Sequence, residues 1–187
     1  MRRGTGRVAG PPYAHEVRAF PTLQRSGRST TLDRAAGDVW AAVASARPDE
    51  DGHVWYVDAP GFVVRGAIDR VALGQGRRWP LPDRDLLRSG DRAGFWEVLE
   101  VDHDTRRMTM QASVRAPGTV RMEVSVADAG ADWSVVTLAI SFAPRGVLGW
   151  TYLVTDLPAR EVVMELTQRA LLADVEATTG ARVRTAG

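Results

Sequence analysis

Polar and apolar residues alternate along the middle of the chain, from about residue 95 to residue 142. Alternation with a period of two is typical of strands that bury one face, and it recurs here in consecutive segments. The expected strands cover residues 95–101, 107–115, 120–126 and 133–142. Between them lie the turn-forming sequences Asp102-His103-Asp104, Pro117-Gly118 and Asp128-Ala129-Gly130. Because such short turns join antiparallel neighbours, the pattern predicts an antiparallel meander.

Apolar residues with helical spacing precede this meander. The spacing from Leu32 onward predicts a first helix that Pro48 closes, and a second helix is expected over residues 60–73. The stretch from Gly74 to Gly90 is rich in Pro, Arg and Asp, so we expect a loop there with at most a short edge strand.

The longest predicted helix runs from about residue 156 to residue 177 and stops near Gly180. Asp156 is suited to its N-cap, and Pro158 to its first turn. A helix of this length needs a large apolar surface to cover, and the meander is the only one that the pattern offers. We therefore expect an α+β helix-grip fold, in which a curved antiparallel β-sheet wraps around a long C-terminal α-helix, with two shorter helices near the N-terminus.

The amino-acid composition excludes several classes of catalytic and binding chemistry. Every one of the 24 basic residues is arginine, and the 187-residue chain contains neither lysine nor cysteine. These absences exclude Schiff-base chemistry, a P-loop lysine, a thiol nucleophile and a disulfide scaffold. The histidines lack HxH or HxxxH spacing, so no metal site is expected. Gly74-Gln75-Gly76 lacks the third glycine of a dinucleotide fingerprint, so no nucleotide cofactor is expected either.

Charge is distributed unevenly along the chain. Residues 1–30 contain six arginines against Glu16 alone, whereas residues 31–180 are acidic overall. We expect residues 1–30 to be a basic, poorly ordered leader, residues 31–180 to form one ligand-binding domain and residues 181–187 to be a short tail. The leader lacks interleaved aromatic residues, so no specific nucleic-acid partner is expected. No secretory signal or membrane span is visible, which favours a cytoplasmic location.

Several motifs occur in a recognisable order. They are Gly90-Asp91 followed by Phe95-Trp96-Glu97-Val98, then Pro117-Gly118 with Met122-Glu123, and the segment FAPRGVLGWTY over residues 142–152. Upstream lie Arg65-Gly66 with Asp69, and Gly76-Arg77-Arg78. Together they resemble an uncharacterised bacterial domain-of-unknown-function family of the SRPBCC (START-like, helix-grip) superfamily, over about residues 37–178.

The resemblance implies a cavity between the sheet and the long C-terminal helix that accepts an apolar small molecule. The family has no agreed catalytic residues, so none is carried over to this chain. Related domains occur fused behind NAD(P)-binding epimerase-like domains, which suggests a reductase-like partner.

Candidate ligand-binding residues are the aromatic, methionine and ionisable residues in or beside these motifs. They are Trp96, Met110, Met122, Trp150, Tyr152, Arg65, Asp69 and Glu97. Core packing is the simpler interpretation for about half of the aromatic residues. Glu97 shares its predicted face with Phe95 and Leu99, and a solvated face or a structural ion pair is the simpler interpretation of that carboxylate.

Three functions fit the sequence. The leading one is binding of a hydrophobic or aromatic small molecule without a cofactor, and an enzymatic role is less favoured. The second is a polyketide cyclase or dehydratase-like enzyme that uses a cavity acid or arginine. The third is an interaction module for a reductase-like partner, and exposed tryptophans such as Trp79 would also be compatible with a homodimer.

Overall fold

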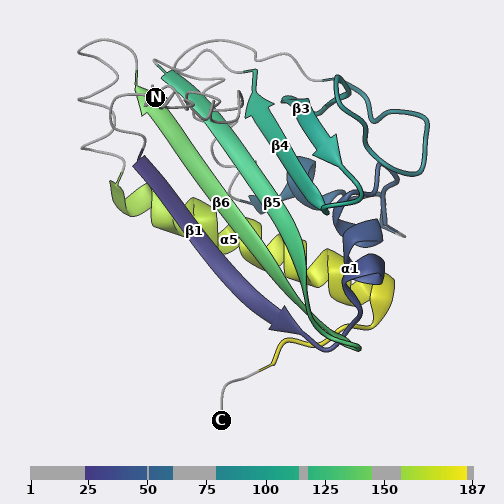
Figure 1. Cartoon of the computed structure of the whole chain (residues 1–187). Coiled ribbons are helices and arrows are strands. Elements are labelled where there is room, and N and C mark those ends of the chain that lie inside the picture. Colours follow the sequence, from purple (N-terminus) through teal and green to yellow (C-terminus); the bar gives the residue numbers. More distant parts are fainter. Residues whose placement is uncertain (1–23, 50, 61–78, 114–117, 145–156, 185–187) are drawn as a thin grey trace, which may run out of the picture.

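The computed structural model describes residues 24–49, 51–60, 79–113, 118–144 and 157–184. Among these residues, strands of one antiparallel sheet follow the order β1-β6-β5-β4-β3-β2 (Figure 1). The strands are β1 (Gln24–Leu32), β2 (Arg92–Ala93), β3 (Trp96–Asp102), β4 (Arg107–Ala112), β5 (Gly118–Gly130) and β6 (Trp133–Pro144). The helices are α1 (Ala36–Val43), α2 (Trp55–Asp58) and α5 (Leu157–Thr179).

Helix α5 lies across one face of the curved sheet, which we call the inner face (Figure 1). Helices α1 and α2 pack against α5 on the same side. The C-terminus of α5 is set by Gly180, whose φ of 68° is a left-handed conformation that glycine adopts without strain. The expected helix-grip fold is therefore confirmed. No helix among the described residues is both long and apolar enough to cross a membrane.

The predicted alternation places the right residues in the core. On β5, Met122, Val124 and Val126 are buried in the core, while the residues between them are partly exposed. Strand β6 repeats the pattern, and helix α5 contributes an apolar stripe that includes Met164 and Leu171. Burial of these side chains is the main stabilising contribution of the sheet-helix layer.

A β-bulge in β3 interrupts the alternation. The register shifts between Val98 and Glu100, so that Val101 lies opposite the inward Met108 and packs on the core. A strict period of two would have left Val101 on the face of Glu97. The bulge also turns Glu100 and Asp102 to the outer face, opposite Thr109 and Arg107.

The predicted domain boundaries at residues 30 and 181 are wrong in part. Residues 24–30, expected in the leader, belong to β1, which pairs with β6 along its whole length. Residues 181–184 also pack on the domain, because Ala181 is buried and the Arg184 amide donates to the Thr31 carbonyl at 3.0 Å. The sequence of β1 shows no alternation of apolar and polar residues, because both faces of this strand are mostly polar. Residues 1–23 lie outside the described residues.

The first helix is shorter than expected, and it begins at Ala36 because Leu32 ends β1. Side chains from outside the helix donate to carbonyls at its C-terminal end. Trp55 Nε1 donates to the Val43 carbonyl at 3.1 Å, and the Tyr56 hydroxyl donates to the Ser45 carbonyl at 3.0 Å. The helix predicted over residues 60–73 lies outside the described residues, and residues 79–90 form the expected loop.

Candidate functional site

Methionines form an apolar layer between the sheet and α5. The chain has five methionines, and the four among the described residues are buried in the same hydrophobic cluster. Met110 on β4 lies directly opposite Met122 on β5, Met108 lies two residues before Met110 on β4, and Met164 belongs to α5. We call these four residues the methionine layer. Each of them is at most 1% exposed.

The structure brings together three of the residues predicted to bind a ligand. Trp96 joins Met110 and Met122 in the core, and its Nε1 donates a 2.6 Å hydrogen bond to the Tyr56 carbonyl. Glu97 instead lies on the outer face, where one of its oxygens is 3.5 Å from Arg92 Nη2. The remaining predicted residues lie outside the described residues: Arg65, Asp69, Trp150 and Tyr152.

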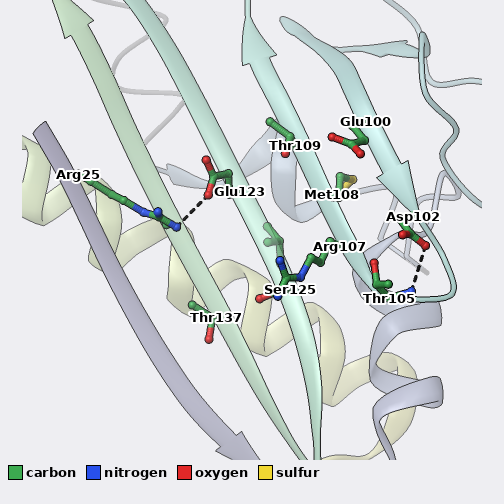
Figure 2. A pocket seen from close by; sticks show the side chains of 12 residues that line it. Arg25, Glu100, Asp102, Thr105, Arg107, Met108, Thr109, Glu123, Ser125 and Thr137 are labelled. Carbon is green, nitrogen blue, oxygen red and sulfur yellow. Dashed lines mark hydrogen bonds and ion pairs between the residues drawn. The ribbon is translucent and has the colours of Figure 1, made fainter. Parts of the chain in front are cut away.

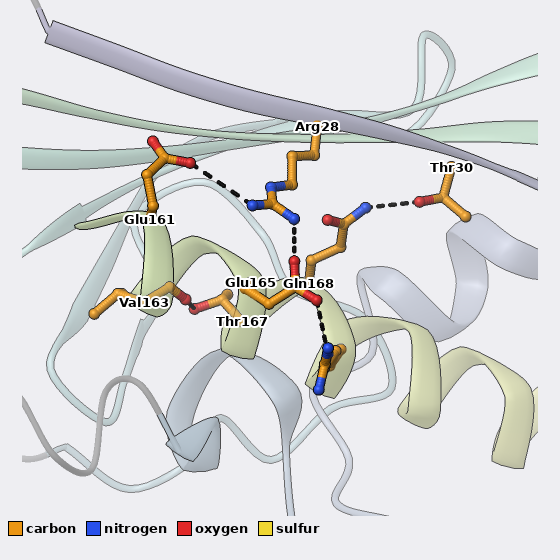
Figure 3. A network of polar contacts seen from close by, with 8 residues as sticks. Arg28, Thr30, Glu161, Val163, Glu165, Thr167 and Gln168 are labelled. Atoms are coloured by element: carbon orange, nitrogen blue, oxygen red, sulfur yellow. Dashed lines mark hydrogen bonds and ion pairs between the residues drawn. The ribbon is translucent and has the colours of Figure 1, made fainter. Parts of the chain in front are cut away.

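A network of polar contacts connects β1 to α5, and we call it the polar seam (Figure 3). It consists of Ser26, Arg28 and Thr30 on β1 with Glu161, Glu165 and Gln168 on α5. Ser26 Oγ donates to Glu161 at 2.7 Å, and Gln168 Nε2 donates to Thr30 Oγ1 at 2.6 Å. Arg28 lies between the two glutamates and contacts both of them.

Charge on the seam is balanced by arginine. Arg169 Nε donates to Glu165 at 2.7 Å, one turn along α5. This hydrogen bond, with a further contribution from Arg28, lowers the pKa of Glu165. The seam therefore connects the edge strand to the helix through polar and charged side chains, whereas the side chains on the inner faces of β3 to β6 that belong to the core are apolar.

The opposite flank of α5 carries a carboxylate in an unfavourable environment. Burial, with a smaller contribution from the negative charge of Asp49, raises the pKa of Asp174 to about 6. Burial also raises the pKa of Tyr56, with Asp174 as the second contributor, so the phenol stays protonated and donates to the Ser45 carbonyl.

A hollow of about 460 Å³ lies on the outer face of the sheet, away from α5 (Figure 2). Short side chains on β5 and β6 form its floor: Ser125, Thr137 and Ala139. Longer and mostly charged side chains surround this floor: Arg25, Glu100, Asp102, Thr105, Arg107, Thr109 and Glu123. We call this feature the outer hollow.

Some charged groups of the outer hollow are already paired. Arg25 Nη2 donates to Glu123 at 2.8 Å, and Asp102 Oδ1 accepts backbone N–H groups of Asp104 and Thr105 at 2.9 and 3.0 Å. Hydrogen bonds to Thr105 lower the pKa of Asp102. Among the described residues, the side chains of Glu100 and Arg107 have neither a hydrogen bond nor an ion-pair partner.

Sequence reasoning missed the outer hollow. The short residues that form its floor belong to different strands, and only the register of β5 with β6 places Ser125 beside Thr137. The bulge in β3 decides that Glu100 faces it. The alternation of small and charged outward residues on β5 was a partial signal.

Two histidines, His53 and His103, lie among the described residues. His103, expected in a solvated turn, accepts a 3.1 Å hydrogen bond from Trp40 Nε1, and its Nε2 is 3.1 Å from the Leu87 carbonyl. His53 lies near Asp49 and Asp51, with potential ligand atoms within 4.8 Å of one another. Asp49 Oδ1 accepts the backbone amides of both Asp51 and His53, so loop geometry accounts for this cluster.

Comparison with known proteins gives one matching family and several similar solved structures. A family model described as "Protein of unknown function (DUF2867)" matches residues 25–167. Comparison with the curated proteins gives no match. Similar solved structures include a truncated norcoclaurine synthase from Thalictrum flavum, with 10% identity, a TM-score of 0.48 and coverage of 84% of this chain and 94% of that chain. Another is the Zhui aromatase/cyclase from Streptomyces sp. R1128, with 14% identity, a TM-score of 0.41 and coverage of 85% and 93%.

Proposed function

We propose that this chain, which belongs to the DUF2867 family of proteins of unknown function, binds an apolar or aromatic small molecule between its sheet and helix α5. The observation that carries the proposal is the methionine layer. All four of its side chains lie on the surfaces that the sheet and α5 turn toward each other.

Methionine is suited to an interior that must change shape. Its side chain is unbranched and polarizable, so it can move between rotamers and contact irregular or aromatic surfaces. Met110 and Met122 are direct cross-strand neighbours, so the rearrangement of one opens space beside the other. When a ligand enters this layer, contacts between apolar side chains are replaced by contacts with the apolar ligand. Burial of the ligand's own apolar surface then favours binding.

The positions of the charged side chains support a binding role over acid or base catalysis. Among the described residues of β3 to β6, the side chains that face α5 are uncharged, and Glu97 and Glu123 lie on the outer face. An enzyme of the cyclase or dehydratase type would need an acid or arginine inside the layer. For that role Arg65 and Asp69 remain the sequence-based candidates.

The exposed apolar residues give less support to an interaction module. Among the described residues the large ones are Leu99, Val162 and Val183. They lie on β3, on α5 and near the C-terminus, so they belong to three different elements and form no continuous patch on one of them.

Methyl NMR tests the proposal directly. We would label the methionine ε-methyl groups with ¹³C and titrate the protein with 2-naphthol as an aromatic probe. The variants Met110→Leu and Met122→Leu assign their signals, because each removes one resonance. We expect saturable shifts of the methyl signals of the methionine layer.

A second measurement uses the ligand that the cell supplies. Native mass spectrometry of protein purified from its own host should detect a co-purified apolar molecule. Leu99→Ala, on the outer face, is the matched control and should bind 2-naphthol as the unmodified chain does. An unliganded mass together with unshifted core methyl signals would overturn the proposal.

A further inference from the structure

The outer hollow lies on the face of the sheet that points away from α5 (Figure 2), and Met108 is the one residue of the methionine layer among its lining residues. We infer that the outer hollow is a second binding site, for a small zwitterion that places an ammonium group on Glu100 and a carboxylate on Arg107. This inference does not rest on the proposed function.

The shape of the outer hollow follows from side-chain length. On its floor, Ser125, Thr137 and Ala139 project little from the sheet, while long side chains stand on both sides. The resulting volume of about 460 Å³ falls in the range of small-molecule sites. The floor is part of the hydrogen-bonded sheet, so the site exists without rearrangement.

The charged groups of the outer hollow that lack a partner indicate which ligand it can bind. Arg25 and Glu123 are bonded to each other, and Asp102 is held by backbone amides. Glu100 and Arg107 are the charged lining groups whose side chains lack a described partner. One positive and one negative group in the same hollow match a molecule that carries both charges.

The spacing of Glu100 and Arg107 sets the separation of the ligand charges. Glu100 lies opposite Thr109 on β4, and Arg107 is two residues from Thr109 on the same strand. Such diagonal neighbours are about 7–8 Å apart between Cα atoms. A ligand with four methylene groups between its charged ends can therefore reach both side chains.

The lining also specifies the kind of cation. The outer hollow has no aromatic side chain among its described lining residues, and a quaternary ammonium needs aromatic faces. A primary ammonium instead donates hydrogen bonds to a carboxylate such as Glu100. The hydroxyl groups of Thr109, Ser125 and Thr137 can accept further hydrogen bonds from it.

The test is a titration of ¹⁵N-labelled full-length protein with 5-aminopentanoate, followed by amide chemical shifts. We expect saturable shifts at Thr109, Ser125 and Thr137, at millimolar concentrations and weakened by added salt. Pentylamine and pentanoate each supply one charge and should bind more weakly. Glu100→Gln and Arg107→Gln should each weaken binding by about three- to fivefold, the range expected for one exposed charge pair.

The control is Arg106→Gln, which removes a neighbouring arginine that pairs with Asp128 and does not line the outer hollow. It should bind 5-aminopentanoate as the unmodified chain does. Linear, non-saturating shifts would overturn the inference, and so would equal affinity of the Glu100→Gln and Arg107→Gln variants. Shifts of the Met110 and Met122 methyl signals report on the methionine layer, since neither residue lines the outer hollow, whereas amide shifts at Thr109, Ser125 and Thr137 report on the hollow. Failure of one proposal can therefore be distinguished from failure of the other.

Discussion

The indole Nε1 of Trp40 donates a 3.1 Å hydrogen bond to Nδ1 of His103, which joins helix α1 to the turn between β3 and β4. Because Nδ1 accepts, the ring proton of the neutral imidazole is on Nε2, from which it reaches the Leu87 carbonyl at 3.1 Å. The two rings also make an edge contact, with centroids 5.9 Å apart. His103 thus ties three separate segments together.

Replacing His103 by alanine should destabilise the protein. The change removes the partner of Trp40 Nε1 and of the Leu87 carbonyl, and each lost hydrogen bond costs about 1 kcal/mol. Urea unfolding followed by tryptophan fluorescence measures the effect. His53→Ala is the control, since His53 is exposed and no such tie depends on its ring. Equal midpoints for the two variants would show that the tie contributes nothing.

Asp174 gives a pH dependence of defined sign. Its pKa is raised from 3.8 to about 6 in the folded chain, so the folded state holds a proton that the unfolded state releases. The free energy of unfolding should therefore fall as pH rises from about 4 through about 6. Asp174→Asn should remove this dependence and be more stable than the unmodified chain at pH 8.

The size of the Asp174 effect is limited by solvent. Each pKa unit corresponds to about 1.4 kcal/mol. We expect only about 1 kcal/mol, because water screens the charge of this half-buried carboxylate. Unfolding midpoints across the pH range measure it, with the exposed Asp132→Asn variant as control. A parallel pH profile for Asp174→Asn and the unmodified chain would contradict this assignment.

The meander and the long helix could be predicted because their periodicity survives in the fold. Met122, Val124 and Val126 occupy the inward positions that alternation assigned to them. Strand β1 could not be predicted, because Arg28 and Thr30 face α5 through the polar seam, where an apolar residue would have marked a strand. Polar contacts between distant segments leave no local period in the sequence.

The candidate sites also differ in whether they depend on a local sequence pattern or on contacts between distant segments. The burial of Trp96, Met110 and Met122 could be predicted because a buried face is a local pattern, whereas their role in ligand binding stays a prediction. The outer hollow depends on a bulge and on cross-strand register, which are properties of pairs of strands. Glu100 therefore becomes a candidate only when its position opposite Thr109 is known.

Removing Arg28 should loosen the edge of the sheet. Arg28 contacts both Glu161 and Glu165, so Arg28→Ala breaks two ion pairs and leaves two neighbouring carboxylates on α5. These groups are partly exposed, so we expect a loss of about 1 kcal/mol that decreases in high salt. Amide hydrogen exchange should accelerate in β1 more than in β4. Arg106→Ala removes a single pair with Asp128 and is the control. A larger loss for that control would argue against the polar seam as the fastening of β1.

Replacing Ser134 by alanine should stabilise the protein. Ser134 is 0% exposed, and its Oγ has no hydrogen-bond partner among the described residues. Its hydroxyl therefore loses water on folding without compensation, and removing it should raise the free energy of unfolding by about 1 kcal/mol. Ser29→Ala is the opposite case, because Ser29 Oγ is 2.9 Å from Thr137 Oγ1 on the outer face. That variant should be neutral or slightly less stable. Chemical denaturation of both variants decides the matter, and a loss of stability in Ser134→Ala would mean that its hydroxyl is bonded in solution.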